Sequence, residues 1–113
     1  MPANTTIMYA NIDDEGLFDL NYYISTHMAL VVEKWVPFGL LGWQVLKFVA
    51  PEGAEKPKYS IMALCTWETL EGAAKAIAAP ESKVVFEDSV NFSQVKPVHH
   101  YTAIVEGSWQ KGQ

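Results

Sequence analysis

The chain has 113 residues, of which half are hydrophobic and 19% are charged, and its formal net charge is −5. This length and composition predict one globular domain, residues 1–113, with an ordered core over about residues 5–106 and a polar C-terminal tail. All eight basic residues are lysines, and they form no cluster of the kind that binds phosphates, so nucleic acid is excluded as the expected partner.

The sequence shows neither a membrane segment nor a secretory signal. No apolar run approaches the roughly 18 residues that a membrane-spanning helix needs. The N-terminus also lacks a basic stretch followed by an apolar run. Cys65 is the single cysteine, which excludes an intrachain disulfide and favours a small buried residue over a nucleophile. We therefore expect a cytoplasmic protein without membrane contact.

In chain order, the first elements are a strand and an amphipathic helix. Residues 5–12 are β-branched and apolar, and the acidic stretch 13–16 forms a turn. Asp19 is suited to cap a helix whose apolar residues then recur at spacings of three and four. Pro37 and Gly39 end that helix.

The rest of the chain begins with a predicted hairpin, which is followed by a second helical region and a last strand. Strands are predicted over residues 40–49 and 59–66, joined by an exposed loop, and an alanine-rich helix follows and stops at Pro80. Residues 81–88 add a helical turn or two, and residues 94–105 form the last strand. The resulting β-α-β-β-α-β order predicts an α+β protein with the ferredoxin-like fold and a four-stranded antiparallel sheet.

The predicted strands are apolar on both faces. In the second strand Leu41, Trp43, Val45 and Val49 lie on one face and Leu40, Leu46 and Phe48 on the other. The helices cover only one face of such a sheet, and the other would leave a large apolar patch in water. A second copy packed sheet against sheet removes this patch, so we expect a homodimer.

His27 is the first candidate for chemistry, because it lies on the inner apolar stripe of the first helix. An imidazole between helix and sheet is desolvated and can act as a general acid or base. Tyr23, one turn earlier on the same stripe, can share its hydrogen bond. The alternative is a core histidine satisfied by one backbone or hydroxyl partner, and the spacing alone favours that alternative.

The other candidates are histidines and aromatic residues on the strands. His99 and His100 are adjacent, so their side chains point to opposite faces, one toward the helices and one toward the dimer interface, and they cannot chelate one metal from one side. We therefore expect no metal. Trp43 and Trp67 either form an aromatic wall for a planar ligand or belong to the core.

The first helix, residues 18–30, reads Phe-Asp-Leu-Asn-Tyr-Tyr-Ile-Ser-Thr-His-Met-Ala-Leu. It resembles the signature of the EthD family, in which Asp-Tyr-Tyr, three variable residues and His are often followed by Met-Pro-Leu. Residues 66–71 resemble the entry to that family's second helix, and residues 87–92 resemble its late Asp-Val-x-Asn-Phe motif. Two departures are Asn21 in place of the usual Asp and Ala29 in place of the usual Pro.

This resemblance implies a dimeric α+β barrel that holds a ligand between the sheet and the helices of each subunit. Several related barrels act without metal or organic cofactor on phenolic, quinone-like or lactone substrates, by oxygenation, isomerisation or dehydration. For this chain it implies a cofactor-independent enzyme acting on an aromatic, quinone-like or polyketide-like molecule.

On this basis His27 and Tyr23 are the expected catalytic residues, and Tyr22, Trp43, Trp67 and His99 are expected to bind the substrate. Two alternatives stay open. One is a carrier that binds a small hydrophobic ligand without converting it. The other is a structural dimer module with a solid core, which a cavity smaller than roughly 300 Å³ would favour.

Overall fold

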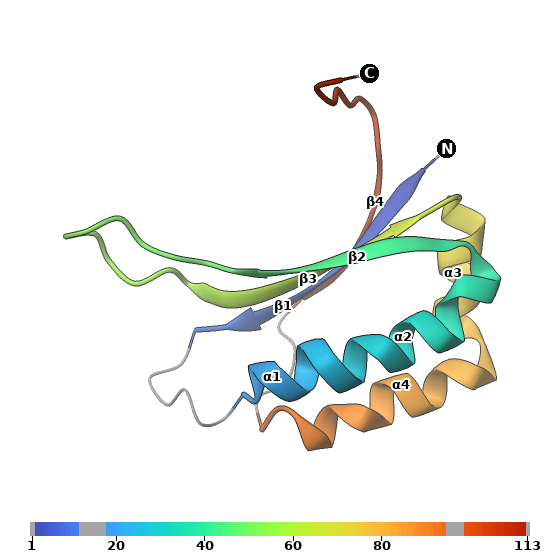
Figure 1. The fold of residues 1–113 in the computed structure, drawn as a ribbon, viewed down its shortest axis with the longest axis horizontal. Coiled ribbons are helices and arrows are strands. Elements are labelled where there is room, and N and C mark those ends of the chain that lie inside the picture. Colours follow the sequence, from blue (N-terminus) through green and yellow to red (C-terminus); the bar gives the residue numbers. More distant parts are fainter. Residues whose placement is uncertain (1, 12–17, 95–98, 113) are drawn as a thin grey trace.

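The computed structural model describes residues 2–11, 18–94 and 99–112, which form a four-stranded antiparallel sheet with helices on one face (Figure 1). The strands lie in the order β2-β3-β1-β4. Their bounds are β1 Ala3–Ala10, β2 Leu40–Lys47, β3 Tyr59–Trp67 and β4 His99–Ile104. This topology confirms the predicted ferredoxin-like βαββαβ arrangement.

The strands differ from the prediction mainly at their ends. β1 begins at Ala3 rather than at residue 5, because Ala3 pairs with both Trp67 of β3 and Ile104 of β4. Pairing on two sides holds this end of the strand in the sheet. The residue pattern of the strand does not reveal this pairing, because the partners lie far away in the chain. Residues 12 and 95–98, which the predicted first and last strands include, lie outside the described residues, and so does the predicted turn over residues 13–16.

The first helical segment is continuous and contains three kinds of turn. It consists of α1 Leu20–Tyr22, a π-helical turn over Tyr23–His27, α2 Met28–Trp35 and a 3₁₀ turn over Val36–Phe38. The predicted cap is confirmed, because the Tyr22 backbone N–H donates to Asp19 Oδ1 at 3.0 Å. The segment ends at Gly39, whose φ of 102° is the left-handed conformation that favours glycine.

The second helical segment follows β3 and lies in the same layer as the first. α3 spans Leu70–Ala78 and is capped by Thr69, whose side chain accepts from the Gly72 backbone N–H at 3.0 Å. Pro80–Ser82 form a 3₁₀ turn, α4 spans Lys83–Glu87, and Asp88–Asn91 form another 3₁₀ turn. Figure 1 shows α2 and α4 side by side beneath the sheet, and these two helices are in contact.

The core lies between the sheet and these helices. Alternate residues of β1 and β3 point into it, and Tyr9, Ile61, Ala63, Cys65 and Trp67 are all buried there. A register irregularity between Leu40 and Gly42 alters the alternation predicted for β2. Leu40 was expected on the face opposite Trp43, but it pairs with Trp67, is buried, and belongs to the same core.

The outer face of the sheet carries apolar side chains that the helices do not cover. Met62 in the middle of β3 pairs with Met8 of β1 and with Leu46 of β2, and Leu46 is partly exposed. Tyr101 on the edge strand is exposed as well. The expectation that the strands are apolar on both faces is therefore met.

Among the described helices, none is long and apolar enough to cross a bilayer.

Candidate functional site

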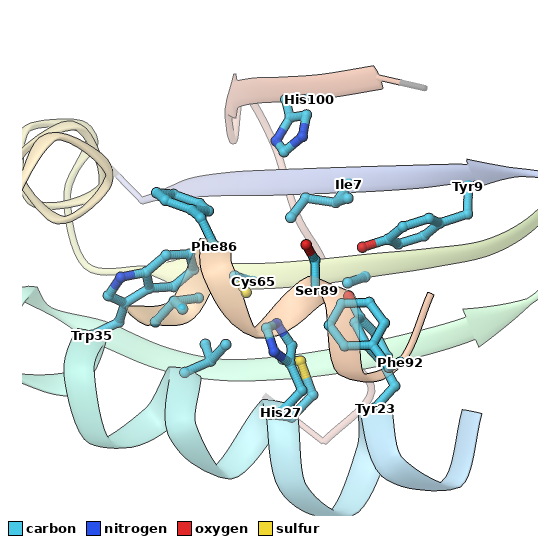
Figure 2. A pocket seen from close by; sticks show the side chains of 14 residues that line it. Ile7, Tyr9, Tyr23, His27, Trp35, Cys65, Phe86, Ser89, Phe92 and His100 are labelled. Carbon is cyan, nitrogen blue, oxygen red and sulfur yellow. The ribbon is translucent and has the colours of Figure 1, made fainter. Parts of the chain in front are cut away.

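A cavity of about 200 Å³ lies between the sheet and the helical segments that contain α2 and α4. His27 extends into it from the helical layer, with Ile7 and Tyr9 of β1 on the sheet side and Ser89 and Phe92 beside it (Figure 2). Its wall is mostly apolar and is lined by Ile7, Tyr9, Tyr23, His27, Met28, Val31, Trp35, Ala63, Cys65, Val85, Phe86, Ser89, Phe92 and His100.

The π-helical turn Tyr23–His27 determines how the helix faces this cavity. His27 and the next residue, Met28, are both buried, and Tyr23 one turn earlier is buried too. A π turn contains one more residue than an α turn, so it shifts the side chains that follow around the helix axis, and such turns are frequent at functional sites. The local backbone thus places both rings of the predicted catalytic pair at the cavity wall.

His27 is oriented by a carboxylate from the second helical segment. Its Nδ1 lies 2.9 Å from Asp88 Oδ2, and the two side chains are only 8% and 13% exposed. Asp88 Oδ1 accepts two further hydrogen bonds, from the Tyr22 hydroxyl at 2.8 Å and from Asn91 Nδ2 at 2.9 Å. The carboxylate is therefore held on both oxygens, and it holds one nitrogen of the imidazole in turn.

The charge states of this pair follow from their surroundings. Burial lowers the pKa of His27 below its ordinary value, although the hydrogen bond and the charge of Asp88 oppose this shift. Burial acts to raise the pKa of Asp88, but hydrogen bonds from Asn91, His27 and Tyr22 lower it overall. At neutral pH the geometry thus fits an ionised Asp88 that accepts from Nδ1–H of a neutral imidazole. The unprotonated nitrogen of that tautomer is Nε2, which is the arrangement of a general base.

Aromatic rings surround the imidazole. The Tyr23 ring stacks on it, with centroids 5.1 Å apart and an interplanar angle of 12°, and the Phe92 centroid lies 4.6 Å away. Burial raises the pKa of Tyr9 to about 12 and raises that of Tyr23 as well, so both phenols stay protonated. Tyr23 therefore contacts His27 by stacking, and Asp88 has the hydrogen-bonding role that was predicted for Tyr23.

The lowered pKa of His27 predicts a pH-dependent contribution to stability. The unfolded chain binds a proton on His27 near the ordinary value of 6.5, before the folded chain does. This contribution is present above that pH and is lost as the pH falls toward the folded pKa, with a slope of at most about 1.4 kcal/mol per pH unit. The difference in unfolding free energy between the wild type and His27→Gln should therefore shrink from about pH 8 to about pH 5, as urea titrations can measure. A constant or growing difference would contradict the lowered pKa.

The structure places the predicted site residues in different surroundings. His27 and Tyr23 line the cavity, and Tyr22 lies behind it as a donor to Asp88. Trp43 and Trp67 lie outside the cavity wall: Trp43 packs against the core, and Trp67 is fully buried with its Nε1 donating to Thr5 Oγ1 at 3.0 Å.

His99 lies on the outer face of the sheet, stacked on Tyr101 with centroids 5.4 Å apart. Its neighbour His100 pairs with Ile7 of β1, points to the helical side and lines the cavity (Figure 2). The two histidines thus divide between the faces as strand alternation requires. The side chain that reaches the cavity is His100, not the His99 that we expected to bind substrate.

Sequence reasoning missed the orienting role of Asp88 and the place of Trp35 and His100 in the wall. A signal for Asp88 and Phe92 was available, because both belong to the stretch 87–92 that resembles a family motif. Asn21 and Ala29, the two departures from the family pattern, are exposed and do not line the cavity.

Two further properties of the site are its metal-ligating groups and its volume. Within the described ranges, no group of three or more His, Cys, Asp or Glu side chains is placed to hold a metal ion. The cavity of about 200 Å³ is smaller than the roughly 300 Å³ of a typical ligand pocket. By the criterion given above, this volume on its own favours the structural module. The cavity adjoins a second hollow of about 220 Å³, with which it shares lining residues.

No protein-family model and no curated protein sequence matches the chain. Solved structures do match it. An EthD-like protein from Ralstonia eutropha superposes with a TM-score of 0.77 at 21% identity, covering 95% of this chain and 96% of that one. An ethyl tert-butyl ether D (EthD) family protein from Bacillus halodurans gives a TM-score of 0.71 at 21% identity, covering 92% and 98%.

A protein of unknown function from Jannaschia, described as dimeric and ferredoxin-like, gives a TM-score of 0.62 at 12% identity over 93% of this chain and 100% of its own. At these identities the similarity establishes the fold. The chain thus has, over nearly its whole length, the fold of EthD-like proteins, in agreement with the resemblance of its first helix to their signature.

Proposed function

We propose that this protein is a cofactor-independent enzyme that uses His27 as a general base on a small aromatic, quinone-like or polyketide-like molecule. The observation that carries this proposal is the part-buried His27–Asp88 pair at 2.9 Å beside an apolar cavity. Asp88 occupies Nδ1, so Nε2 is the nitrogen that can accept a proton from a ligand. A neutral, oriented imidazole near an apolar binding site is what proton abstraction at neutral pH requires.

The other reactive groups of the wall are poorer candidates. Burial raises the pKa of the Cys65 thiol to about 11, so it carries little thiolate and is a weak nucleophile. Tyr9 and Tyr23 stay protonated and share a hydrogen bond with each other. They fit a supporting role as donors or as apolar surface, and His27 remains the group suited to take the proton.

Two reaction types are compatible with this base. Removal of a proton next to a carbonyl gives an enolate, which can lose water or take the proton back at another carbon; these are dehydration and isomerisation. Removal of a phenolic proton gives an electron-rich anion, which can react with dioxygen as the co-substrate. Both types begin with the same proton transfer to Nε2, so the site favours the class of chemistry and does not select between them.

A screen for conversion tests the proposal. Phenols, quinones and polyketide fragments are first tested for binding by quenching of the four tryptophans, and each molecule that binds is incubated with the protein and followed by mass spectrometry. We expect at least one of them to be converted, with a rate that rises as the pH passes the pKa of His27. If ligands bind and none is converted across the screen, the alternative of a carrier protein is favoured instead.

We also propose that the outer face of the sheet is covered by a second copy of the chain. Met62 lies at the centre of this face between Met8 and Leu46. An apolar sheet face left in water is unfavourable, and a two-fold axis lets the same patch cover itself.

Sedimentation velocity should therefore find a dimer at micromolar concentration, and Met62→Glu should shift it to monomer because the buried charge is not paired. Val84→Glu, on the exposed side of α4, is the matched control and should stay dimeric. A wild-type monomer would contradict the proposal.

A further inference from the structure

The second hollow lies beside the His27 cavity, under the edge strand of the sheet. The helices leave the helix-facing side of β4 uncovered, and His100 and Thr102 on that side are exposed. The hollow has a volume of about 220 Å³ and is lined on the helical side by Ile77 of α3 and Phe86 of α4, which are themselves partly exposed. It shares four lining residues with the His27 cavity, namely Ile7, Trp35, Phe86 and His100.

The two volumes together allow one ligand to occupy both spaces. A cavity of about 150 Å³ holds a benzene molecule, so the His27 cavity of about 200 Å³ has room for one substituted ring. Ligand pockets are usually about 300 Å³ or larger, a size that the His27 cavity reaches only when the adjoining hollow is included. Trp35 and Phe86 contribute to the wall of both spaces, so an aromatic surface continues from one to the other.

The polar groups that line the second hollow come from β1 and β4, and the Thr6 hydroxyl of β1 donates to the Tyr101 carbonyl oxygen. Thr5 also lines it, but its hydroxyl oxygen accepts from Trp67 Nε1. His100 and Thr102 project from alternate positions of β4 on the same face. A ring oxygen that reaches this end of the site meets an imidazole and a hydroxyl, both able to donate or accept.

We propose that the two hollows form one elongated site for a planar ligand of two or more fused rings, with an oxygen in the second hollow that Thr102 recognises and with His100, which lines both hollows, beside it. This proposal depends on the proposed function only in placing the reacting ring beside His27. The substrate is then a fused-ring phenol or quinone that carries oxygen at both ends, rather than a single-ring phenol.

Calorimetric binding of three probes tests the length of the site. We expect phenol to bind most weakly, 2-naphthol more tightly, and 2,6-dihydroxynaphthalene most tightly, because the second ring buries additional apolar area and the second hydroxyl reaches β4. Thr102→Phe fills the second hollow and leaves the His27 cavity unchanged. It should raise Kd about tenfold or more for both naphthalene probes and leave that of phenol the same.

Thr102→Val, which keeps the size of the side chain and removes its hydroxyl, tests the polar end, and it should reduce the preference for the diol over 2-naphthol. Val84→Phe, which lines neither hollow, controls for an added ring at an exposed position. Equal affinities for phenol and 2-naphthol, or an equal loss for all probes in Thr102→Phe, would overturn the proposal. Because binding is measured and not turnover, tight binding without conversion would count against the proposed enzyme and leave the elongated site intact.

Discussion

Replacing His27 by glutamine is expected to lower the turnover of any substrate found in the screen by about 10²–10⁴-fold, the usual contribution of a positioned general base. Glutamine keeps the approximate size of imidazole and can still bond to Asp88, but it cannot accept a proton at neutral pH. The loss should therefore appear in kcat, while KM changes little, because the apolar wall that binds the ligand is unchanged.

The matched control for this variant is Thr26→Ala, one residue earlier on the same π turn, where the side chain is exposed. Circular dichroism and sedimentation velocity should show both variants folded and in the wild-type assembly state. Unchanged turnover in a folded His27→Gln protein would eliminate His27 as the base. In that case the buried imidazole would be the core histidine that the sequence also allows.

Replacing Asp88 by asparagine is expected to lower kcat by about 10²-fold or more, through His27 rather than through contact with substrate. The carboxylate accepts from Nδ1–H, whereas an amide can donate to Nδ1 and so favour the tautomer with the proton on Nε2. That tautomer cannot act as a base from the nitrogen that faces a ligand. Asp88 is thus predicted to be a positioning residue.

The pH profile distinguishes this role from a structural one. Asp88 raises the pKa of His27 through its hydrogen bond and charge, against the effect of burial. Its removal should therefore move the acidic limb of the kcat/KM profile to lower pH, in addition to lowering the plateau. Tyr22→Phe removes one donor to Asp88 and keeps the carboxylate, so it should reduce kcat far less. A profile of unchanged shape in Asp88→Asn would argue that the carboxylate serves only the fold.

Much of the fold could be read from the sequence because its signals are local. The Asp19 cap, the helical spacing that includes Tyr23 and His27, and the stop at Gly39 all depend on residues within a few positions of one another. The order of elements then restricts the topology to a four-stranded antiparallel sheet. The register irregularity near Leu40 was not predicted, because its position depends on pairing with β3.

The candidate site depends on contacts between residues far apart in the chain. Asp88 is 61 positions from His27, and nothing in the spacing around either residue indicates that they form a hydrogen bond. Likewise, alternation along β4 predicts that His99 and His100 face opposite sides, but only the pairing with β1 decides that His100 faces the helices. The place of Trp67 in the core and of Trp35 in the cavity wall could be assigned only from the packed structure, since aromatic residues suit both positions equally well.

The sequence by itself therefore determined the element order, the amphipathic helix that carries His27, and the apolar character of both sheet faces, because periodicity and caps act over short distances. Only the tertiary structure decided that His27 is oriented by Asp88, that His100 rather than His99 reaches the cavity, and that a second hollow adjoins the first. The physical reason is that each of these depends on which residues the packing of helices against the sheet brings within a few ångströms of each other.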